Sequence, residues 1–225
     1  MDEPGLPPAE VADAYAVLRS INNQLGNRRT ILRELSRFLV DEERNFVEGP
    51  FTVLDVGSGS GDLPQAIQAE LSRRFLKSRV VTIDHDPIAA RESGRLGLHS
   101  TRGDALRLPF ADASIDLVTA VKFAHHFSDA RLATLIGEMA RVARRRVLIL
   151  DIRRDWIAYW GFIVWSRVFT SNRLVRYDGP LSVLRGFTPS ELLDLSRPLT
   201  HFSWSVSRHL GFQLTLVGRR IVPPA

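Results

Sequence analysis

The feature that most constrains the fold is the glycine-rich run VLDVGSGSGDLP at residues 53–64. A strand-like segment leads into Asp55, and Gly57, Gly59 and Gly61 follow with one residue between each. Glycine adopts positive φ readily and lets a ligand lie against the backbone. A helix is expected to begin at the end of the run, where its first N–H groups are unpaired. The run therefore predicts a strand, a ligand-binding turn and a helix.

The spacing of the glycines discriminates between nucleotide cofactors. A dinucleotide site has the pattern G-x-G-x-x-G, in which the third small residue packs the helix on the strand. Counted from Gly57, that third position is Asp62, which is neither glycine nor alanine. The carboxylate of Asp55 in front of the loop suits a cationic cofactor with a free amino group better than a pyrophosphate. A glycine-rich turn without a ligand is the alternative.

The loop D-x-G-x-G-x-G resembles motif I of the class I S-adenosylmethionine (SAM)-dependent methyltransferases. The stretch 106–116 is similar to the LPF.D.SFD run of that family, and the matches together cover about residues 51–151. The resemblance implies SAM as the cofactor. It also implies an antiparallel pair of strands at the edge of the sheet near the C-terminus.

The other residues expected at the cofactor stand at strand ends, because doubly wound sheets bind ligands beyond the carboxyl ends of their strands. Asp84 ends the second strand, and the resemblance assigns its carboxylate to the ribose hydroxyls. Asp104 follows the third strand, and in similar proteins this acid faces the adenine amino group. The full set expected at SAM is Asp55, Gly57, Ser58, Gly59, Gly61, Asp84, His85, Asp104, Ala105 and Val121.

Apolar strand patterns alternate with helical ones from residue 51 onward. This alternation predicts an α/β fold, a doubly wound Rossmann-like sheet that is mostly parallel and has seven strands. The strands are expected at 51–56, 79–84, 98–101, 115–121, 146–151, 202–209 and 212–221, and helices at 63–76, from 87, at 129–143 and after 188.

We expect a single methyltransferase domain made of four segments. Residues 1–48 form an N-terminal helical cap, and 49–151 form the SAM-binding core. Residues 152–200 form an aromatic-rich helical lid insertion, and 201–225 form a C-terminal strand pair. The cap is expected to cover the cofactor cleft, with padding of the sheet as the alternative.

Methyl transfer from a sulfonium is an in-line displacement, so the site must align the acceptor, exclude water and remove a proton from a hydroxyl or carbon acid. His126 and His125 follow the fourth strand and are candidate bases, with His126 slightly favoured. A structural role is the alternative for either histidine. Asp151, at the end of the fifth strand, is the third candidate. A helix cap or a salt bridge to Arg153 or Arg154 is its alternative.

The acceptor is expected to be a hydrophobic small molecule. The fourth strand lacks the Asn/Asp-Pro-Pro-Tyr/Phe signature that resembling proteins use on amide or amino nitrogens. Aromatic side chains of the insertion stack on rings, and Trp156, Trp160 and Tyr177 are the candidate contacts. The alternative is that they pack the insertion on the domain. The chain resembles methyltransferases of the ubiquinone/menaquinone and polyketide-tailoring type, which implies O- or C-methylation of a phenol, quinol or polyketide.

Composition restricts the other classes of function. The absence of cysteine excludes disulfides, thiolate metal sites and a cysteine nucleophile, and no spacing of His, Asp and Glu indicates a metal site. The net charge of +5 is spread widely, and its densest cluster, Arg144–Arg146, precedes a buried strand. We interpret it as solvated surface and expect no nucleic-acid partner. An RNA or protein methyltransferase recruited by charge, and a non-catalytic SAM-binding protein, are the alternative functions.

The sequence also bears on location and assembly. The N-terminus lacks a signal-peptide pattern, and the longest apolar run, near residues 156–169, is too short to span a bilayer. We therefore expect a cytoplasmic monomer or homodimer. Peripheral contact of that run with a membrane is a further alternative for a lipid-like acceptor.

Overall fold

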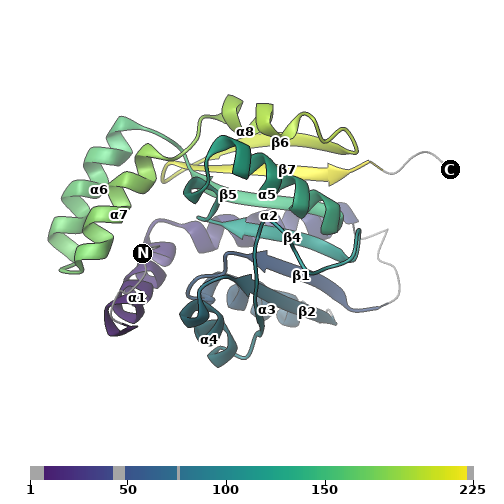
Figure 1. The fold of residues 1–225 in the computed structure, drawn as a ribbon, viewed down its shortest axis with the longest axis horizontal. Coiled ribbons are helices and arrows are strands. Elements are labelled where there is room, and N and C mark those ends of the chain that lie inside the picture. Colours follow the sequence, from purple (N-terminus) through teal and green to yellow (C-terminus); the bar gives the residue numbers. More distant parts are fainter. Residues whose placement is uncertain (1–7, 43–48, 75–76, 222–225) are drawn as a thin grey trace.

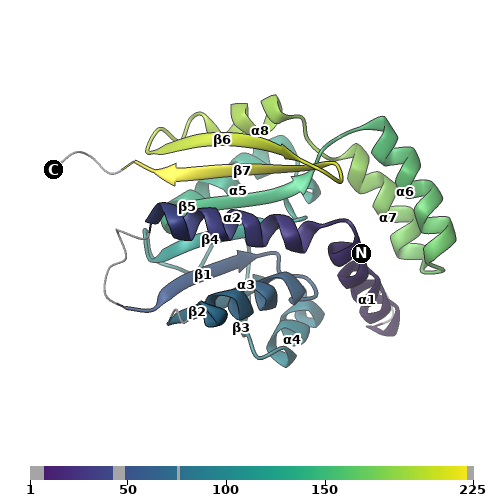
Figure 2. The same cartoon turned by 180° about the vertical axis from the view of Figure 1, so that it is seen from behind.

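The computed structural model describes residues 8–42, 49–74 and 77–221. Within these ranges the chain forms one seven-stranded sheet covered by helices on both faces (Figure 1 and Figure 2). The strands are β1 (Phe51–Val56), β2 (Ser78–Asp84), β3 (His99–Arg102), β4 (Ile115–Val121), β5 (Ala143–Ile152), β6 (Phe202–His209) and β7 (Gln213–Arg220).

The strand order is β3-β2-β1-β4-β5-β7-β6. Strands β1 to β5 are parallel, and β7 runs antiparallel to both β5 and β6. This confirms the doubly wound sheet and the antiparallel pair at its edge. All seven residues of β4 are buried, as expected for a parallel strand covered on both faces.

Helices connect and cover the strands. Their bounds are α1 (Pro8–Gln24), α2 (Asn27–Glu42), α3 (Asp62–Arg73), α4 (Pro87–Arg95), α5 (Asp129–Val142), α6 (Trp156–Phe169), α7 (Arg173–Leu184) and α8 (Pro189–Ser196), with a 3-10 turn η1 (Ala124–His126). The expected extension of α3 through residues 75–76 lies outside the described residues. Of the described helices, none is long and apolar enough to cross a bilayer.

Strand β5 begins three residues earlier than the sequence predicts. The arginines at its start are not free surface charges. Arg144 Nη1 lies 3.0 Å from Asp116 Oδ1, and the guanidinium of buried Arg146 lies 4.3 Å from the centre of the Phe38 ring. The densest basic cluster of the sequence is therefore largely taken up by contacts within the fold.

The two helices of the expected cap do different things. Helix α2 pads the sheet, because its Leu35 and Phe38 belong to the core that also contains Val53. Helix α1 instead lies at the carboxyl ends of the strands, where Tyr15 packs on Ala89 at the start of α4. Figure 1 shows α1, α6 and α7 at this same end of the sheet. Helix α2 therefore pads the sheet, and α1 lies at the end of the sheet where the cofactor cleft is expected.

Candidate functional site

The site lies where the chain switches sides of the sheet, between β1 and β4. In doubly wound sheets the connections leave these two central strands in opposite directions, which opens a crevice beyond their carboxyl ends. The glycine loop follows β1 there, and η1 follows β4. Asp151 stands near the end of the neighbouring strand β5.

Two glycines of the loop are required by both conformation and space. Gly57 has φ of 70° and Gly61 has φ of 73°, in the left-handed region. A Cβ on Gly57 would lie 2.3 Å from the ring of Phe123. A Cβ on Gly61 would lie 2.8 Å from Ser93 Oγ in α4. Phe123 and Ser93 can therefore approach the loop this closely only because Gly57 and Gly61 have no side chain.

Asp84 braces the glycine loop from the end of β2. Its Oδ2 accepts a hydrogen bond of 2.9 Å from the Gly59 N–H, and its Oδ1 accepts one of 3.0 Å from the Asp86 N–H. Burial raises the pKa of Asp84, and these two backbone N–H groups act in the opposite direction. A carboxylate has about four acceptor positions, so two remain for the hydroxyls of a ligand. Exposed His85 stands next to it.

Asp55 is buried near the end of β1, just before the glycine loop. The register of β1 and β4 places it opposite Thr119, whose hydroxyl donates a 2.5 Å hydrogen bond to Asp55 Oδ1. Burial raises the pKa of Asp55 to about 7; the Thr119 hydrogen bond opposes this, and Asp62 and Asp84 raise it further. Three carboxyl groups thus face one loop, an environment that favours a cationic ligand.

Helix α1 reaches over the loop with two polar side chains. The Tyr15 hydroxyl donates a 2.8 Å hydrogen bond to Asp86 Oδ2, and its ring is 3.7 Å from where a Cβ of Gly59 would stand. The Asn22 amide donates to Asp62 Oδ2 at 3.2 Å. Sequence analysis assigned no role to either residue, since their helical spacing carries no information about what the helix covers.

The remaining predicted cofactor residues differ in accessibility. Asp104 is exposed beyond β3, and its Oδ1 accepts the Leu106 N–H at 2.9 Å, while Ala105 is half-buried. Ser58 is buried, with its hydroxyl 3.3 Å from Ser93 Oγ, so its side chain packs toward α4. Val121 is buried at the end of β4. Their roles at the cofactor stay predictions.

A buried histidine–carboxylate pair joins the ends of β4 and β5. His125 Nδ1 lies 2.8 Å from Asp151 Oδ1, and the His125 N–H donates to Asp151 Oδ2 at 3.2 Å. Burial raises the pKa of Asp151, but the charges of His125 and Lys122 outweigh it and lower this pKa to about 2. A proton on His125 Nδ1 would point at Asp151 Oδ1, and in that tautomer Nε2 faces away from Asp151 as an acceptor.

The two arginines considered as salt-bridge partners of Asp151 pair with other carboxylates instead. Arg153 pairs with Asp155 at 3.1 Å, and Arg154 pairs with Glu191. His126 is exposed, and its ring centre lies 4.3 Å from that of His125. Of the two histidines, it is therefore His125 that Asp151 holds.

A cavity of about 450 Å³ opens beside this pair. It lies between η1, the start of α5 and the segment that joins α7 to α8. Its lining is mixed, with two histidines, two arginines, two acidic side chains and apolar side chains: His125, His126, Phe127, Asp129, Arg154, Leu184, Arg185, Phe187 and Glu191. A molecule that is both apolar and hydroxyl-bearing fits such a lining.

The sequence placed Lys122 with Val121 at the end of the fourth strand, beside the expected methyl group, but gave it no chemical role. Lys122 follows β4 with φ of 55°, an uncommon conformation for a residue with a side chain. Burial lowers its pKa to about 8, and the charge of Asp151 acts in the opposite direction. A strained backbone and a lowered lysine pKa beside the histidine pair are features of functional sites.

The three aromatic residues predicted to contact the acceptor lie elsewhere. Trp156 and Trp160 are exposed on α6, and Tyr177 is exposed on α7. The described residues that line the cavity beside His125 include none of them. The structure therefore does not bring them together with the histidines, and their contact with an acceptor stays a prediction.

Comparison with known proteins gives a consistent result. A family model described as "Methyltransferase domain" matches residues 53–146. Demethylmenaquinone methyltransferase of Deinococcus radiodurans is 37% identical over 160 residues, which cover 66% of this chain and 63% of that protein. The chain spans less than two-thirds of the length of the first curated relatives it matches.

Solved structures share the fold at low sequence identity. A SAM-dependent methyltransferase from Aquifex aeolicus superposes with a TM-score of 0.63 at 14% identity, covering 96% of this chain and 100% of that one. The magnesium protoporphyrin IX methyltransferase from Synechocystis, with bound S-adenosylhomocysteine (SAH), has a TM-score of 0.59 at 16% identity and covers 87% of this chain and 84% of that one.

Proposed function

We propose that the chain is a class I SAM-dependent methyltransferase that transfers a methyl group from SAM to a hydroxyl, or to an activated carbon, of a hydrophobic small molecule such as a phenol, quinol or polyketide. The observation that carries the acceptor class is the buried His125–Asp151 pair at the edge of the mixed apolar and polar cavity. Asp151 orients the ring, so His125 Nε2 is the atom that takes the acceptor proton.

The cofactor side of the proposal rests on the carboxyl groups of the glycine loop. SAM, when bound, supplies a methyl group on a positively charged sulfonium. Asp84 has free acceptor positions for the ribose hydroxyls, and the charges of Asp55 and Asp62 favour a cationic ligand. Tyr15 and Asn22 from α1 cover the loop and limit access of water to it.

The names of similar proteins support a ring-containing acceptor. The Deinococcus relative is named for demethylmenaquinone, and the Synechocystis structure is named for magnesium protoporphyrin IX. Both names describe bulky acceptors with ring systems. Leu184 and Phe187 give the cavity beside His125 an apolar part, and Arg185 gives it a basic side chain, whereas Arg154 is paired with Glu191 in the same lining.

Calorimetric titration with SAM and SAH tests the cofactor assignment. We expect micromolar-range binding by the wild type and at least about tenfold weaker binding by Asp84→Asn, because a charge-assisted acceptor is lost. Asp194→Asn, at an exposed carboxylate on α8, is the matched control and should bind like the wild type. Absence of binding by the wild type would remove the cofactor assignment.

Transfer of a labelled methyl group from SAM tests the acceptor class. Phenols and short-chain quinols are offered to the wild type and to the His125→Gln variant. Label on these acceptors, lost in the variant, supports the proposal. Label on RNA or protein instead would favour the alternative of a charge-recruited enzyme. SAM binding without label on any acceptor would favour a non-catalytic SAM-binding protein.

A further inference from the structure

Helix α6 carries its apolar side chains outward. Trp156, Trp160, Val164 and Val168 are spaced four residues apart, so they form one stripe along the helix. They are 71%, 62%, 63% and 68% exposed, and we call them the α6 stripe. Within α6, every residue of which is described, only Ser166 is buried. Contiguous exposed apolar surface of this kind marks an interaction site.

The fold does not need the α6 stripe for its own packing. The opposite face of the helix provides the contacts, because Phe162 and Trp165 pack with Ile21 of α1 and Val175 of α7. Phe162 fits so closely that a Cβ on Gly179 of α7 would clash with its ring. The helix is thus fixed from the inside, and the stripe is held facing outward.

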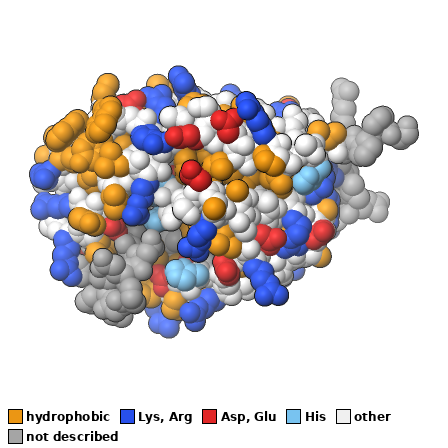
Figure 3. All heavy atoms as spheres, turned by 45° about the horizontal axis from the view of Figure 1, so that its top comes forward, with side chains coloured by type: hydrophobic (Ala, Val, Ile, Leu, Met, Phe, Trp, Pro, Cys, Tyr) orange, Lys and Arg blue, Asp and Glu red, His pale blue; other side chains and the backbone are white. Residues whose placement is uncertain are grey.

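The charge around the α6 stripe is strongly positive. Residues 152–186, which contain α6 and α7, carry six arginines and two aspartates, most of the net charge of +5 of the whole chain. Arg167 and Arg185 are exposed, as is Arg154, which pairs with Glu191. Figure 3 shows the apolar side chains gathered at the α6–α7 end of the molecule, with basic side chains around them.

We propose that the α6 stripe docks on an anionic phospholipid surface, with α6 lying in the plane of the interface. Exposed tryptophans with apolar neighbours suit the boundary between headgroups and acyl chains, and arginines beside them attract anionic lipids. A helix of 14 residues is too short to span a bilayer. The apolar side chains suit a lipid surface, and the positive charge beside them favours an anionic lipid surface over a neutral apolar partner.

The position of the α6–α7 hairpin gives this docking a consequence for the acceptor. Arg154 lies just before α6, Leu184 ends α7, and both line the cavity beside His125. A membrane bound at the α6 stripe would hold the cavity near the lipid surface, where a hydrophobic acceptor is dissolved. This consequence rests on the proposed function, whereas the docking itself does not.

Co-sedimentation with lipid vesicles tests the docking without any turnover. The vesicles are phosphatidylcholine alone, and phosphatidylcholine with phosphatidylglycerol in about a 7:3 ratio. We expect the wild type to bind the anionic vesicles at least about tenfold more tightly, and less tightly as salt rises from about 0.05 to 0.5 M. Absence of binding to anionic vesicles, or equal binding to both kinds, would overturn the proposal.

Two pairs of variants locate the contact. Trp156→Ser/Trp160→Ser should weaken binding to anionic vesicles at least about tenfold, because two interfacial anchors are lost. Leu210→Ser, at a residue that is 95% exposed in the β6–β7 turn, should bind like the wild type. Arg167→Gln/Arg173→Gln should weaken binding to anionic vesicles only, with exposed Arg208→Gln as its control. Equal binding by the tryptophan variant and the wild type would contradict the assignment to α6.

Two further measurements separate the rival outcomes. A dimer in sedimentation velocity that dissociates in the Trp156→Ser/Trp160→Ser variant would assign the α6 stripe to a second copy of the chain and overturn the proposal. SAM affinity of this variant should equal that of the wild type, because the α6 stripe lies away from the glycine loop. Failure of vesicle binding with intact SAM binding therefore rejects the docking and leaves the proposed function standing.

Discussion

Burial and the neighbouring carboxyl groups both disfavour ionisation of Asp55, which links the cofactor site to pH. Burial raises the pKa of this carboxyl group to about 7, and the Thr119 hydroxyl acts in the opposite direction by donating a hydrogen bond to it. A bound cation would supply the missing stabilisation. We therefore expect the proton on Asp55 to be released when the cofactor binds.

The first prediction concerns stability. In the unfolded chain Asp55 has a pKa near 4, so between about pH 4 and 7 the folded state holds more proton than the unfolded state. The free energy of unfolding should therefore fall as pH rises through this window, by at most about 1.4 kcal/mol per pH unit. Asp55→Asn should lack this decrease, and urea unfolding of both proteins from pH 5 to 8 measures it.

Asp194→Asn is the control for the Asp55 variant, since its carboxylate is exposed and pairs only at the surface. Its free energy of unfolding should change with pH as that of the wild type does. SAM affinity of the wild type should rise from pH 6 to 8, while that of Asp55→Asn should stay nearly flat. If the free energy of unfolding changed with pH in the same way in the wild type and in Asp55→Asn, burial would not control the pKa of the Asp55 carboxyl group.

The second prediction separates the two histidines. His125→Gln and Asp151→Asn should each lower kcat by roughly 10²-fold or more, because the base is removed or loses its orientation. His126→Gln should change kcat less than about tenfold, since it is the ring of His125 that Asp151 holds and His126 is exposed. Steady-state kinetics and SAM titrations measure both effects. Loss of activity in His126→Gln alone would reverse the assignment.

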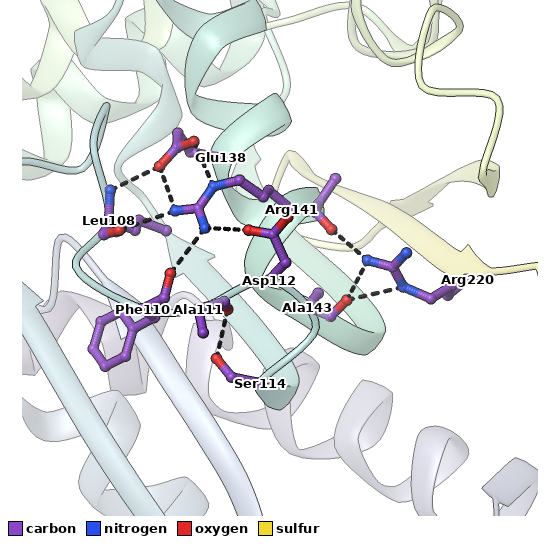
Figure 4. A network of polar contacts seen from close by, with 10 residues as sticks. Leu108, Phe110, Ala111, Asp112, Ser114, Glu138, Arg141, Ala143 and Arg220 are labelled. Atoms are coloured by element: carbon purple, nitrogen blue, oxygen red, sulfur yellow. Dashed lines mark hydrogen bonds and ion pairs between the residues drawn. The ribbon is translucent and has the colours of Figure 1, made fainter.

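Loops at the site depend on anchors in neighbouring elements, and Arg141 of α5 is the clearest case (Figure 4). Its guanidinium donates to the carbonyls of Leu108 and Phe110 at 2.9 and 2.8 Å, and pairs with Glu138 and Asp112. The segment it holds joins β3 to β4 and carries Asp104. One partly exposed arginine thus fixes a loop that contains no helix or strand.

The third prediction belongs to this loop. Arg141→Gln should lower the free energy of unfolding by about 1–3 kcal/mol, because several charged hydrogen bonds are lost. It should also weaken SAM binding through the displaced Asp104. Arg73→Gln is the control, since the exposed Arg73 pairs with Glu70 within α3. Equal SAM affinities in both variants would show that Arg141 does not position the adenine side of the site.

At the scale of the whole molecule, segments far apart in sequence meet over the carboxyl ends of the strands. Ile21 of α1 packs with Val175 of α7 and with Phe162 and Trp165 of α6. Asn172 donates a 2.7 Å hydrogen bond to Asp13 in the same contact. The N-terminal helix and the α6–α7 hairpin therefore pack as one unit, and we propose that this unit is a cover of the cofactor and acceptor sites.

The fourth prediction is that this cover opens as a unit. Ile21→Ala removes a buried side chain at its centre, at a cost of about 2–5 kcal/mol to the local contact. Amide hydrogen exchange should then accelerate in both α1 and α6–α7, and stay unchanged in β1, β4 and β5. SAH should restore protection in α1 of the wild type. Acceleration confined to α1 would show that the two segments move independently.

The sequence by itself determined the elements and their order. Periodic apolar patterns placed all seven strands within a few residues, because the alternation of side chains along a strand is a local property. The glycine spacing and the acids at the strand ends likewise predicted the cofactor loop. These signals are readable since each depends on residues close together in the chain.

Only the tertiary structure decided which side chains meet. It paired His125 rather than His126 with Asp151, marked Lys122 through its backbone, and brought Tyr15 over the glycine loop. It also turned Trp156 and Trp160 outward, where the sequence expected acceptor contacts. These outcomes depend on how helices and strands remote in sequence pack against one another, which sets burial and neighbouring charge and leaves no trace in local spacing.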